Sequence, residues 1–412
     1  MEKTKKPELL LPASSLEVLK VAVDYGADAV YIGGELFSLR ANARNFSEED
    51  MEAGIAYAHE HGKKVYVTMN ITAHNDDIEG IKAYIGTLNR LKPDAVIISD
   101  PGVFTLAKDD LDPEIDIHIS TQANNVNYLT FEFWRKMGAR RVVTGRELSL
   151  KEIKEIREHI PDDFEIETFV HGAMCISYSG RCLLSNFMTG RDANKGECTH
   201  PCRWKYTLME ESRPGEYFPV YENDRGTYIF NSKDLCMIEH IPELVKAGID
   251  SFKIEGRMKT ALYVASVART YRKALDDYFE SSEKYESNMD RYREEISKCT
   301  YRNFTTGFFF GKPGSDAQVY DSNVYCRNYI YLGIAEEIKD DGSFVLMQRN
   351  KFSVGDEVEL MEFAGENHVS KVLGMWDDEG NEIDSCPHPK QMIRVKLSHV
   401  PERGNIIRIK EA

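Results

Sequence analysis

Hydrophobic and polar positions follow two alternating periods over the first three quarters of the chain. Short runs with the two-residue alternation of β-strands are separated by stretches with the 3.6-residue period of amphipathic helices. One such helix is expected over residues 47–62, SEEDMEAGIAYAHEHG, where Ser47 caps an acidic first turn. The strand candidates are residues 8–13, 29–34, 64–70, 95–100, 116–122, 140–146, 164–172 and 251–257. Eight strands alternating with helices predict an α/β fold, a (β/α)8 TIM-like barrel, with a doubly wound open sheet as the alternative.

The connection between the seventh and eighth predicted strands is far too long for one helix. It covers about residues 173–250. A segment that follows a barrel strand opens onto the C-terminal face, where barrel enzymes carry their active sites. We therefore expect an insertion over the mouth of the barrel.

The pattern changes again after the eighth predicted strand. From about residue 327, short alternating strands are separated by tight turns such as DDG at 340–342. This pattern predicts a small β-barrel domain over residues 327–412. A linker over residues 311–326 would join it to a barrel domain over residues 1–310.

Polar side chains alternate with apolar ones near the ends of several predicted strands. The positions of interest are Gln122, Arg146, His171, Lys253, Glu255 and Arg257. Because helices cover the outer faces of barrel strands, we expect these polar side chains to point into the barrel. An active-site mouth would explain them, and so would a buried ion network whose members satisfy one another.

The insertion holds four of the eight cysteines of the chain, with the spacing C-x6-C-x15-C-x3-C. These are Cys175, Cys182, Cys198 and Cys202. Structural zinc sites usually contain C-x2-4-C pairs, whereas iron–sulfur clusters accept varied spacings. The spacing alone leaves both metals open, and Cys236 is a reserve ligand close to the group in sequence.

Basic residues of the insertion lie among aromatic ones, as in CRWKY at 202–206. Arg181, Arg203 and Lys205 are candidates to bind phosphates beside a stacked base, although an ordinary solvated surface would look similar. The net charge of −16 weighs against a nucleic-acid partner without excluding local binding.

No apolar run approaches the ~20 residues that span a bilayer, so we expect a cytoplasmic protein with no membrane partner. In that reducing compartment, clustered cysteines indicate metal chemistry more than disulfides.

The segment ETFVHGAMCISYSGRCLLS, residues 167–185, resembles the signature of the peptidase U32 family. FKIEGRMK at 252–259 and ELLLPA at 8–13 also resemble that family, and the similarity extends over essentially the whole chain. The resemblance implies a [4Fe–4S] cluster. The cysteines that match its ligands are Cys175, Cys182, Cys198 and Cys202, with Cys236 in reserve for the fourth position.

Within the family, the sequence is most similar to the tRNA-hydroxylating branch. That resemblance implies oxygen-independent conversion of the wobble uridine of tRNA to 5-hydroxyuridine, with prephenate as the hydroxyl donor. It makes tRNA the expected partner and leaves room for a second U32-family subunit. On this interpretation the catalytic candidates are Arg146, Lys253, Glu255 and Arg257. The substrate-binding candidates are His171, Gln122, Arg181, Arg203 and Lys205.

Two other functions fit the sequence. The family name implies a collagenase-like peptidase, but the chain contains neither H-E-x-x-H nor G-x-S-x-G. A non-catalytic RNA-binding protein with a structural metal is the other alternative.

Overall fold

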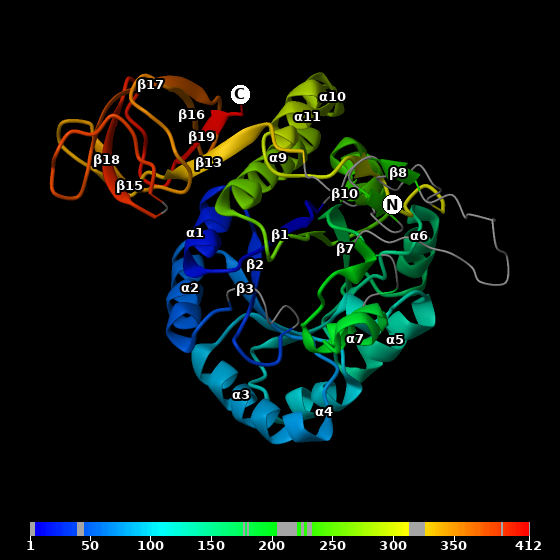
Figure 1. Cartoon of the computed structure of the whole chain (residues 1–412). Helices are drawn as coiled ribbons and strands as arrows, with labels where there is room; N and C mark the ends of the chain where they lie inside the picture. Colours follow the sequence, from blue (N-terminus) through cyan, green and yellow to red (C-terminus); the bar gives the residue numbers. More distant parts are fainter. Residues whose placement is uncertain are drawn as a thin grey trace, which may run out of the picture.

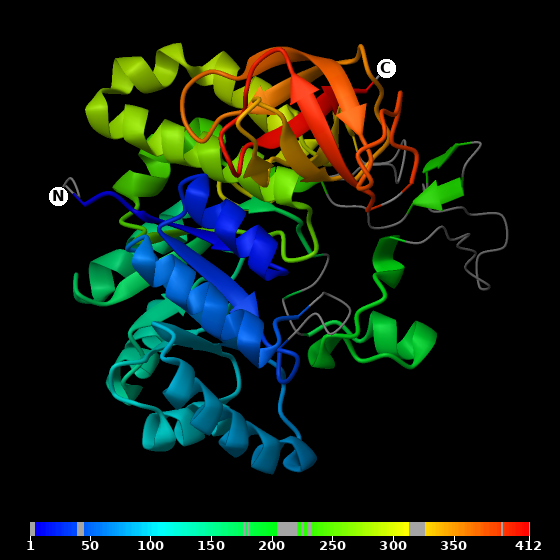
Figure 2. The same cartoon turned by 90° about the vertical axis from the view of Figure 1, so that its left-hand side faces the viewer.

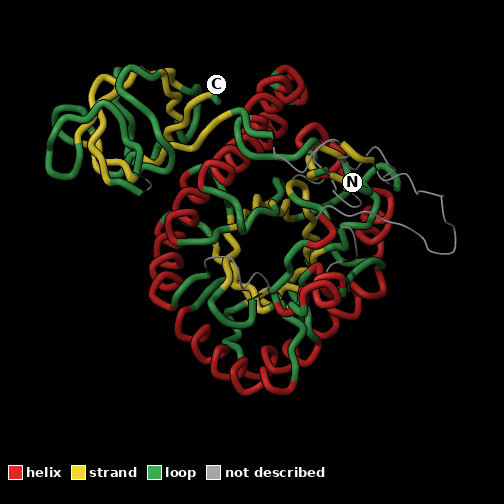
Figure 3. The backbone as a smooth tube through the Cα atoms, in the orientation of Figure 1, coloured by secondary structure: helices red, strands yellow, loops and turns green. Residues whose placement is uncertain are grey.

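A closed barrel of eight parallel strands forms the larger part of the molecule, and helices surround it (Figures 1 and 3). The computed structural model describes residues 5–38, 45–175, 178, 181–203, 221–223, 226–228, 233–312, 326–388 and 390–411. The barrel strands are β1 (Glu8–Pro12), β2 (Ala29–Gly33), β3 (Lys64–Met69), β4 (Ala95–Ile98), β5 (Asp116–Ile119), β6 (Arg141–Val143), β7 (Glu165–Gly172) and β11 (Ser251–Ile254). Each strand pairs with the next, and β11 pairs with both β7 and β1, which closes the ring. The predicted TIM-like barrel is confirmed.

The helices between the strands form the outer layer. They are α1 (Leu16–Asp24), α2 (Glu48–Glu60), α3 (Ile78–Leu91), α4 (Pro101–Asp110), α5 (Tyr128–Met137), α6 (Leu150–His159), α8 (Ile241–Lys246) and α9 (Ala261–Glu280). The Ser47 side chain accepts a hydrogen bond from the Asp50 backbone N–H at 3.1 Å and starts α2, as its sequence predicts. Among the helices in the described ranges, none combines the length and the apolar character needed to span a bilayer.

The segment between β7 and β11 is the predicted insertion. Its elements are α7 (Leu184–Thr189), β8 (Tyr221–Asn223), β9 (Gly226–Tyr228), β10 (Asp234–Cys236) and the short 3-10 turns η3 (Ala193–Lys195), η4 (Pro201–Arg203) and η5 (Ile238–His240). β10 pairs antiparallel with β7 and parallel with β12 (Phe304–Thr305), so two further strands extend the sheet beyond the barrel. Figure 2 shows α7 on the side of the barrel where the strands end, over its mouth.

After α10 (Ser282–Ser287) and α11 (Met289–Ser297), the chain forms a separate seven-stranded antiparallel sheet. Its strands are β13 (Tyr329–Ile334), β14 (Glu337–Ile338), β15 (Phe344–Met347), β16 (Glu357–Met361), β17 (His368–Trp376), β18 (Met392–Leu397) and β19 (Ile406–Lys410). This C-terminal sheet encloses its own apolar core, which includes Phe344, Leu360 and Val395. Most of the predicted linker lies outside the described residues, since 313–325 are not among them.

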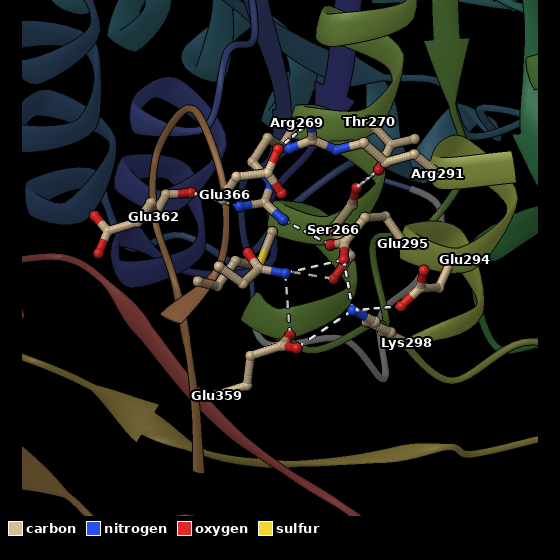
Figure 4. Close-up of polar contacts among 12 residues, drawn as sticks. Ser266, Arg269, Thr270, Arg291, Glu294, Glu295, Lys298, Glu359, Glu362 and Glu366 are labelled. Carbon is tan, nitrogen blue, oxygen red and sulfur yellow. Dashed lines mark hydrogen bonds and ion pairs between the residues drawn. The ribbon is translucent and has the colours of Figure 1, made fainter. Parts of the chain in front are cut away.

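A buried ionic network fixes the C-terminal sheet to the barrel helices (Figure 4). Arg408 of β19 is fully buried and contacts both Glu359 of β16 and Glu295 of α11. Lys298 lies 2.8 Å from Glu295 and 3.3 Å from Glu359, so cations and carboxylates alternate across the boundary. The Tyr25 hydroxyl donates to the Met361 carbonyl at 2.7 Å and ties α1 to the same sheet.

Candidate active site at the barrel mouth

Polar side chains lie in two layers of the barrel interior. The lower layer, farther from the C-terminal ends of the strands, is a buried ion network. Arg141 is 3% exposed, and its Nη1 lies 2.6 Å from Glu8 Oε1 and 2.9 Å from Glu167 Oε2. Lys253 Nζ donates to Glu167 Oε1 at 2.6 Å. Burial by itself would raise the pKa of Glu8, but the Arg141 charge and hydrogen bonds outweigh it and lower the pKa to about 2. The ion-network interpretation of the polar strand faces therefore holds for this layer, and Lys253 is a member of it.

A pocket lies above this network at the C-terminal ends of the strands. Its lining includes Tyr31, Thr68, Asn70, Ser120, Gln122, Arg146, Phe169, Lys253, Glu255 and Arg257. Five of the residues singled out in the sequence thus meet in one place. The lining combines cations, a carboxylate, amides and hydroxyls around aromatic walls, which suits a small polar ligand.

Arg257 forms one wall of the pocket, and its guanidinium donates hydrogen bonds to neighbouring side chains of the protein. Its Nη1 donates to Ser38 Oγ at 2.7 Å and to Thr68 Oγ1 at 3.3 Å, and its Nη2 donates to Asn45 Oδ1 at 3.0 Å. A Cβ at Gly33 would lie 2.0 Å from Arg257 Nη2, so a larger residue there would displace the guanidinium from its present position. Sequence reasoning did not identify Ser38 or Asn45, because both lie outside the predicted strands.

Arg146 connects the pocket to the cysteine-bearing insertion. Its guanidinium lies 4.2 Å from the centre of the Phe169 ring, and its Nη2 lies 3.7 Å from Glu255 Oε2. Its Nη1 donates to the Ala173 carbonyl at 3.3 Å and to Cys175 Sγ at 3.9 Å. One side chain therefore touches both the pocket lining and the first cysteine.

Gln122, which follows β5, contributes an amide to the lining of the pocket. Asn70 Nδ2 donates to Gln122 Oε1 at 3.0 Å, and Ser120 Oγ donates to the same oxygen. These contacts fix the orientation of the Gln122 side chain, whose position in the pocket agrees with the prediction from strand alternation.

His171 lies outside the pocket, and the predicted alternation fails at this residue. The register between β7 and β11 shifts, so that Phe169 pairs with Lys253 but His171 pairs with Ile254. The imidazole consequently packs against the rings of Tyr263 and Tyr271 on the helix side of the strand. Burial lowers the pKa of His171 to about 3.

The four clustered cysteines lie on the insertion above the mouth. They are Cys175 just beyond β7, Cys182 just before α7, Cys198 after η3 and Cys202 within η4. Cys175 is exposed and the other three are partly buried. The Thr199 backbone N–H donates to Ser185 Oγ at 3.1 Å, which ties α7 to the segment between the last two cysteines. Thiols are the donors that an iron–sulfur cluster takes, but within the described part of the chain no three of these sulfur atoms lie within 4.8 Å of one another, so the structure does not gather them around one point.

The reserve ligand Cys236 lies in a different environment. It is on β10, paired with His171 of β7. Burial raises the pKa of its thiol to about 12, and a thiol must lose its proton to bind a metal. Cys202 lies on the insertion with the other three cysteines, so it stays the expected fourth ligand with Cys236 in reserve.

The basic residues of the insertion are only partly described. Arg181 is exposed and precedes α7. The side chain of Arg203 and the whole of Lys205 lie outside the described residues. Lys195 Nζ lies 3.7 Å from Asp77 Oδ2, in the loop after β3, so the insertion reaches across the mouth.

An exposed apolar surface on α7 was not identified from the sequence. Phe187 is 83% exposed, and Leu183 and Met188 beside it are also exposed. Large exposed apolar side chains that cluster on one element mark an interaction surface. The helix is too short for its sequence to show a distinct polar and apolar face, so no pattern pointed to it.

The sequence profile of peptidase family U32 matches residues 14–319, and that of the U32 C-terminal domain matches residues 327–408. The chain belongs to peptidase family U32. It is 42% identical to tRNA hydroxylation protein P1 of Bacillus subtilis over 98% of this chain and 95% of that protein. It is 41% identical to tRNA hydroxylation protein P of Escherichia coli over 86% of each. It is 45% identical to the uncharacterized protease MJ0090 of Methanocaldococcus jannaschii over 74% of this chain and 73% of that protein.

Proposed function

We propose that this chain is an iron–sulfur enzyme that converts the wobble uridine of tRNA to 5-hydroxyuridine without oxygen, with prephenate as the hydroxyl donor. The observation that carries the proposal is the position of Arg146, which contacts the pocket lining and Cys175 at once. A small substrate in the pocket and a group held by the cysteines would therefore be neighbours. The names of two full-length relatives supply the tRNA and the reaction type.

The cluster would be held by Cys175, Cys182, Cys198 and Cys202. An iron–sulfur cluster there would supply electron transfer or activation of a bound oxygen-containing group. Arg146 would place positive charge beside the Cys175 sulfur. The same guanidinium would orient a substrate carboxylate through a two-pronged hydrogen bond.

The donor would occupy the pocket above the ion network. Prephenate carries two carboxylates, and Arg146 and Arg257 both present guanidiniums to the pocket. Lys253 is held by Glu167 in the layer below, so its role is to shape the floor of the pocket more than to bind a carboxylate. Gln122 offers its amide for a substrate hydroxyl or carbonyl.

The uridine must leave its stack to reach this pocket, as in other enzymes that modify a single base. Phe187 on α7 would then stack on a base beside the mouth, since stacking on exposed aromatic rings is common in single-stranded RNA binding. Exposed Arg181 would contact the adjacent phosphates.

A peptidase of the kind that the family name suggests fits this pocket less well. Among its described lining residues, Ser120 offers a hydroxyl, but no histidine or cysteine is present to activate or replace it. A non-catalytic RNA-binding protein would not need two guanidiniums, an amide and a carboxylate converging on one buried site.

Nucleoside analysis of tRNA from a deletion strain of the host tests the proposal. We expect 5-hydroxyuridine and its derivatives to disappear, and to return with the wild-type gene but not with Cys175→Ser. An anaerobic preparation should show the broad visible absorption of an iron–sulfur cluster and about four irons per chain. Unchanged tRNA nucleosides, or a colourless protein that binds only zinc, would contradict the proposal.

A further inference from the structure

A group of metal-binding side chains lies on the C-terminal sheet, remote in sequence from the four clustered cysteines. Glu362, His368 and His399 each place one ligand atom within 4.8 Å of the other two. Glu362 follows β16, His368 begins β17 and His399 follows β18. We propose that these three residues bind a divalent transition-metal ion of the zinc class.

The three side chains must rotate about their side-chain bonds to enclose an ion. The imidazole rings of His368 and His399 are stacked, with centroids 4.2 Å apart and an interplanar angle of 14°. Glu362 Oε1 lies 4.0 Å from His368 Nε2. Zinc–ligand bonds of about 2.0–2.2 Å place two tetrahedral ligands about 3.3 Å apart. Because each imidazole lone pair lies in its ring plane, at least one of the two rings must rotate out of the stack to direct its nitrogen at the ion.

The backbone positions of the three ligands are already fixed. His368 pairs with Leu360 in the β16–β17 ladder, and the His399 N–H donates to Ser370 Oγ at 2.9 Å. The Glu362 carbonyl accepts a hydrogen bond from Arg269 Nη1 of α9 at 2.8 Å (Figure 4). Binding would therefore order only three side chains, which keeps the entropic cost small.

The donor set selects the class of ion. Two imidazole nitrogens and one carboxylate oxygen suit zinc and its transition-metal neighbours, whereas calcium and magnesium prefer oxygen ligands throughout. His368 and His399 are exposed, so water can complete the coordination and the ion can enter from solvent.

The position of Glu362 links this site to the contact between the two parts of the molecule. Arg269 holds the Glu362 carbonyl, and Arg291 Nη2 donates to the Gly365 carbonyl at 2.6 Å. An ion bound by Glu362 would therefore stabilise residues 362–367 in the conformation that docks on α9 and α11.

Calorimetric titration of the full-length protein with Zn²⁺ tests the site. The comparison is between wild type, the double variant His368→Gln/His399→Gln, and the control His388→Gln, an exposed histidine of the same sheet region. Any zinc taken by the cysteines is common to all three proteins. We expect the double variant to bind one Zn²⁺ fewer per chain and the control to match wild type.

A second variant and a second measurement guard against misfolding of the double variant. Glu362→Gln removes one ligand but keeps the backbone contact to Arg269, and we expect its zinc affinity to fall at least ~10-fold, since loss of a mere supporting contact costs 10–100-fold. Zn²⁺ should also slow amide hydrogen exchange over residues 362–368 in wild type and in the His388→Gln control, but not in the double variant. Equal zinc stoichiometry in the three proteins, or exchange in this segment that does not respond to zinc, would overturn the site.

Discussion

The ion pair between Arg146 and Glu255 offers a double-mutant cycle that separates catalysis from stability. Arg146 Nη2 and Glu255 Oε2 are 3.7 Å apart, and the two side chains are 8% and 14% exposed. Unit charges at that distance interact by about 4 kcal/mol at an effective dielectric constant of 20, before desolvation is subtracted. Interaction energies measured for contacting residues are about 0.5–3 kcal/mol, and we expect a value in the upper half of that range.

Arg146→Gln should lower the free energy of unfolding by about 3 kcal/mol, because Glu255 keeps its charge in a buried place and loses this partner. Glu255→Gln should have an effect of similar sign. The double variant should lose clearly less than the sum of the two, since neither charge then remains. Urea unfolding of anaerobic protein, followed by circular dichroism, measures all three values.

Activity should behave differently from stability in the same cycle. The double variant regains stability but lacks the guanidinium that faces both Cys175 and the pocket, so we expect tRNA hydroxylation to stay below a tenth of the wild-type rate. Mass spectrometry of tRNA nucleosides and iron content are measured on the same preparations. If the double variant hydroxylates tRNA at the wild-type rate, Arg146 only balances the charge of Glu255 and the proposed role is wrong.

Three further changes test other parts of the site. Gly33→Ala should abolish hydroxylation and lower the melting temperature, because the new Cβ would lie 2.0 Å from Arg257 Nη2; normal activity would show that the guanidinium can move without consequence. Phe187→Ala should weaken tRNA binding by about 1–3 kcal/mol without changing stability, whereas Leu129→Ala, at a similarly exposed position on α5, should leave binding unchanged in a filter-binding assay. His171 has a pKa of about 3 when folded and about 6.5 when unfolded, so its contribution to stability is present above pH 6.5 and is lost as the pH falls toward 3. His171→Phe should therefore reduce the loss of unfolding free energy between pH 6.5 and 5 by about 2 kcal/mol, and an unchanged pH dependence would contradict this.

The barrel could be predicted because each of its strands has one face toward helices and one toward the interior. That arrangement leaves a two-residue period in the sequence, as in Lys253 and Glu255 beside the apolar Phe252 and Ile254. The strands of the C-terminal sheet show the same two-residue period in the sequence, and the tight turns between them indicate where each strand ends. The cysteine insertion was evident from its length alone.

The failures of prediction have local physical causes. Strand alternation assigns His171 to the interior, but the register shift between β7 and β11 turns the residue toward α9, and no composition signal marks such a shift. Strand alternation also cannot show that Lys253 belongs to the ion network and Arg257 to the pocket wall. It predicts which face of the strand a side chain lies on, but not which residues it contacts. Glu167, which holds Lys253, lies 86 residues earlier in the chain.

The two layers of the interior explain how an acidic protein can present guanidiniums to an internal pocket. In the lower layer, the carboxylates of Glu8 and Glu167 match the charges of Arg141 and Lys253. In the upper layer, Arg146 faces Glu255, and Arg257 donates hydrogen bonds to side-chain oxygen atoms of Ser38, Thr68 and Asn45. Two guanidiniums therefore line the pocket although the whole chain has a net charge of −16. A ligand in the pocket would meet these guanidiniums at short range, where their charges act on it more strongly than the net charge of the whole molecule.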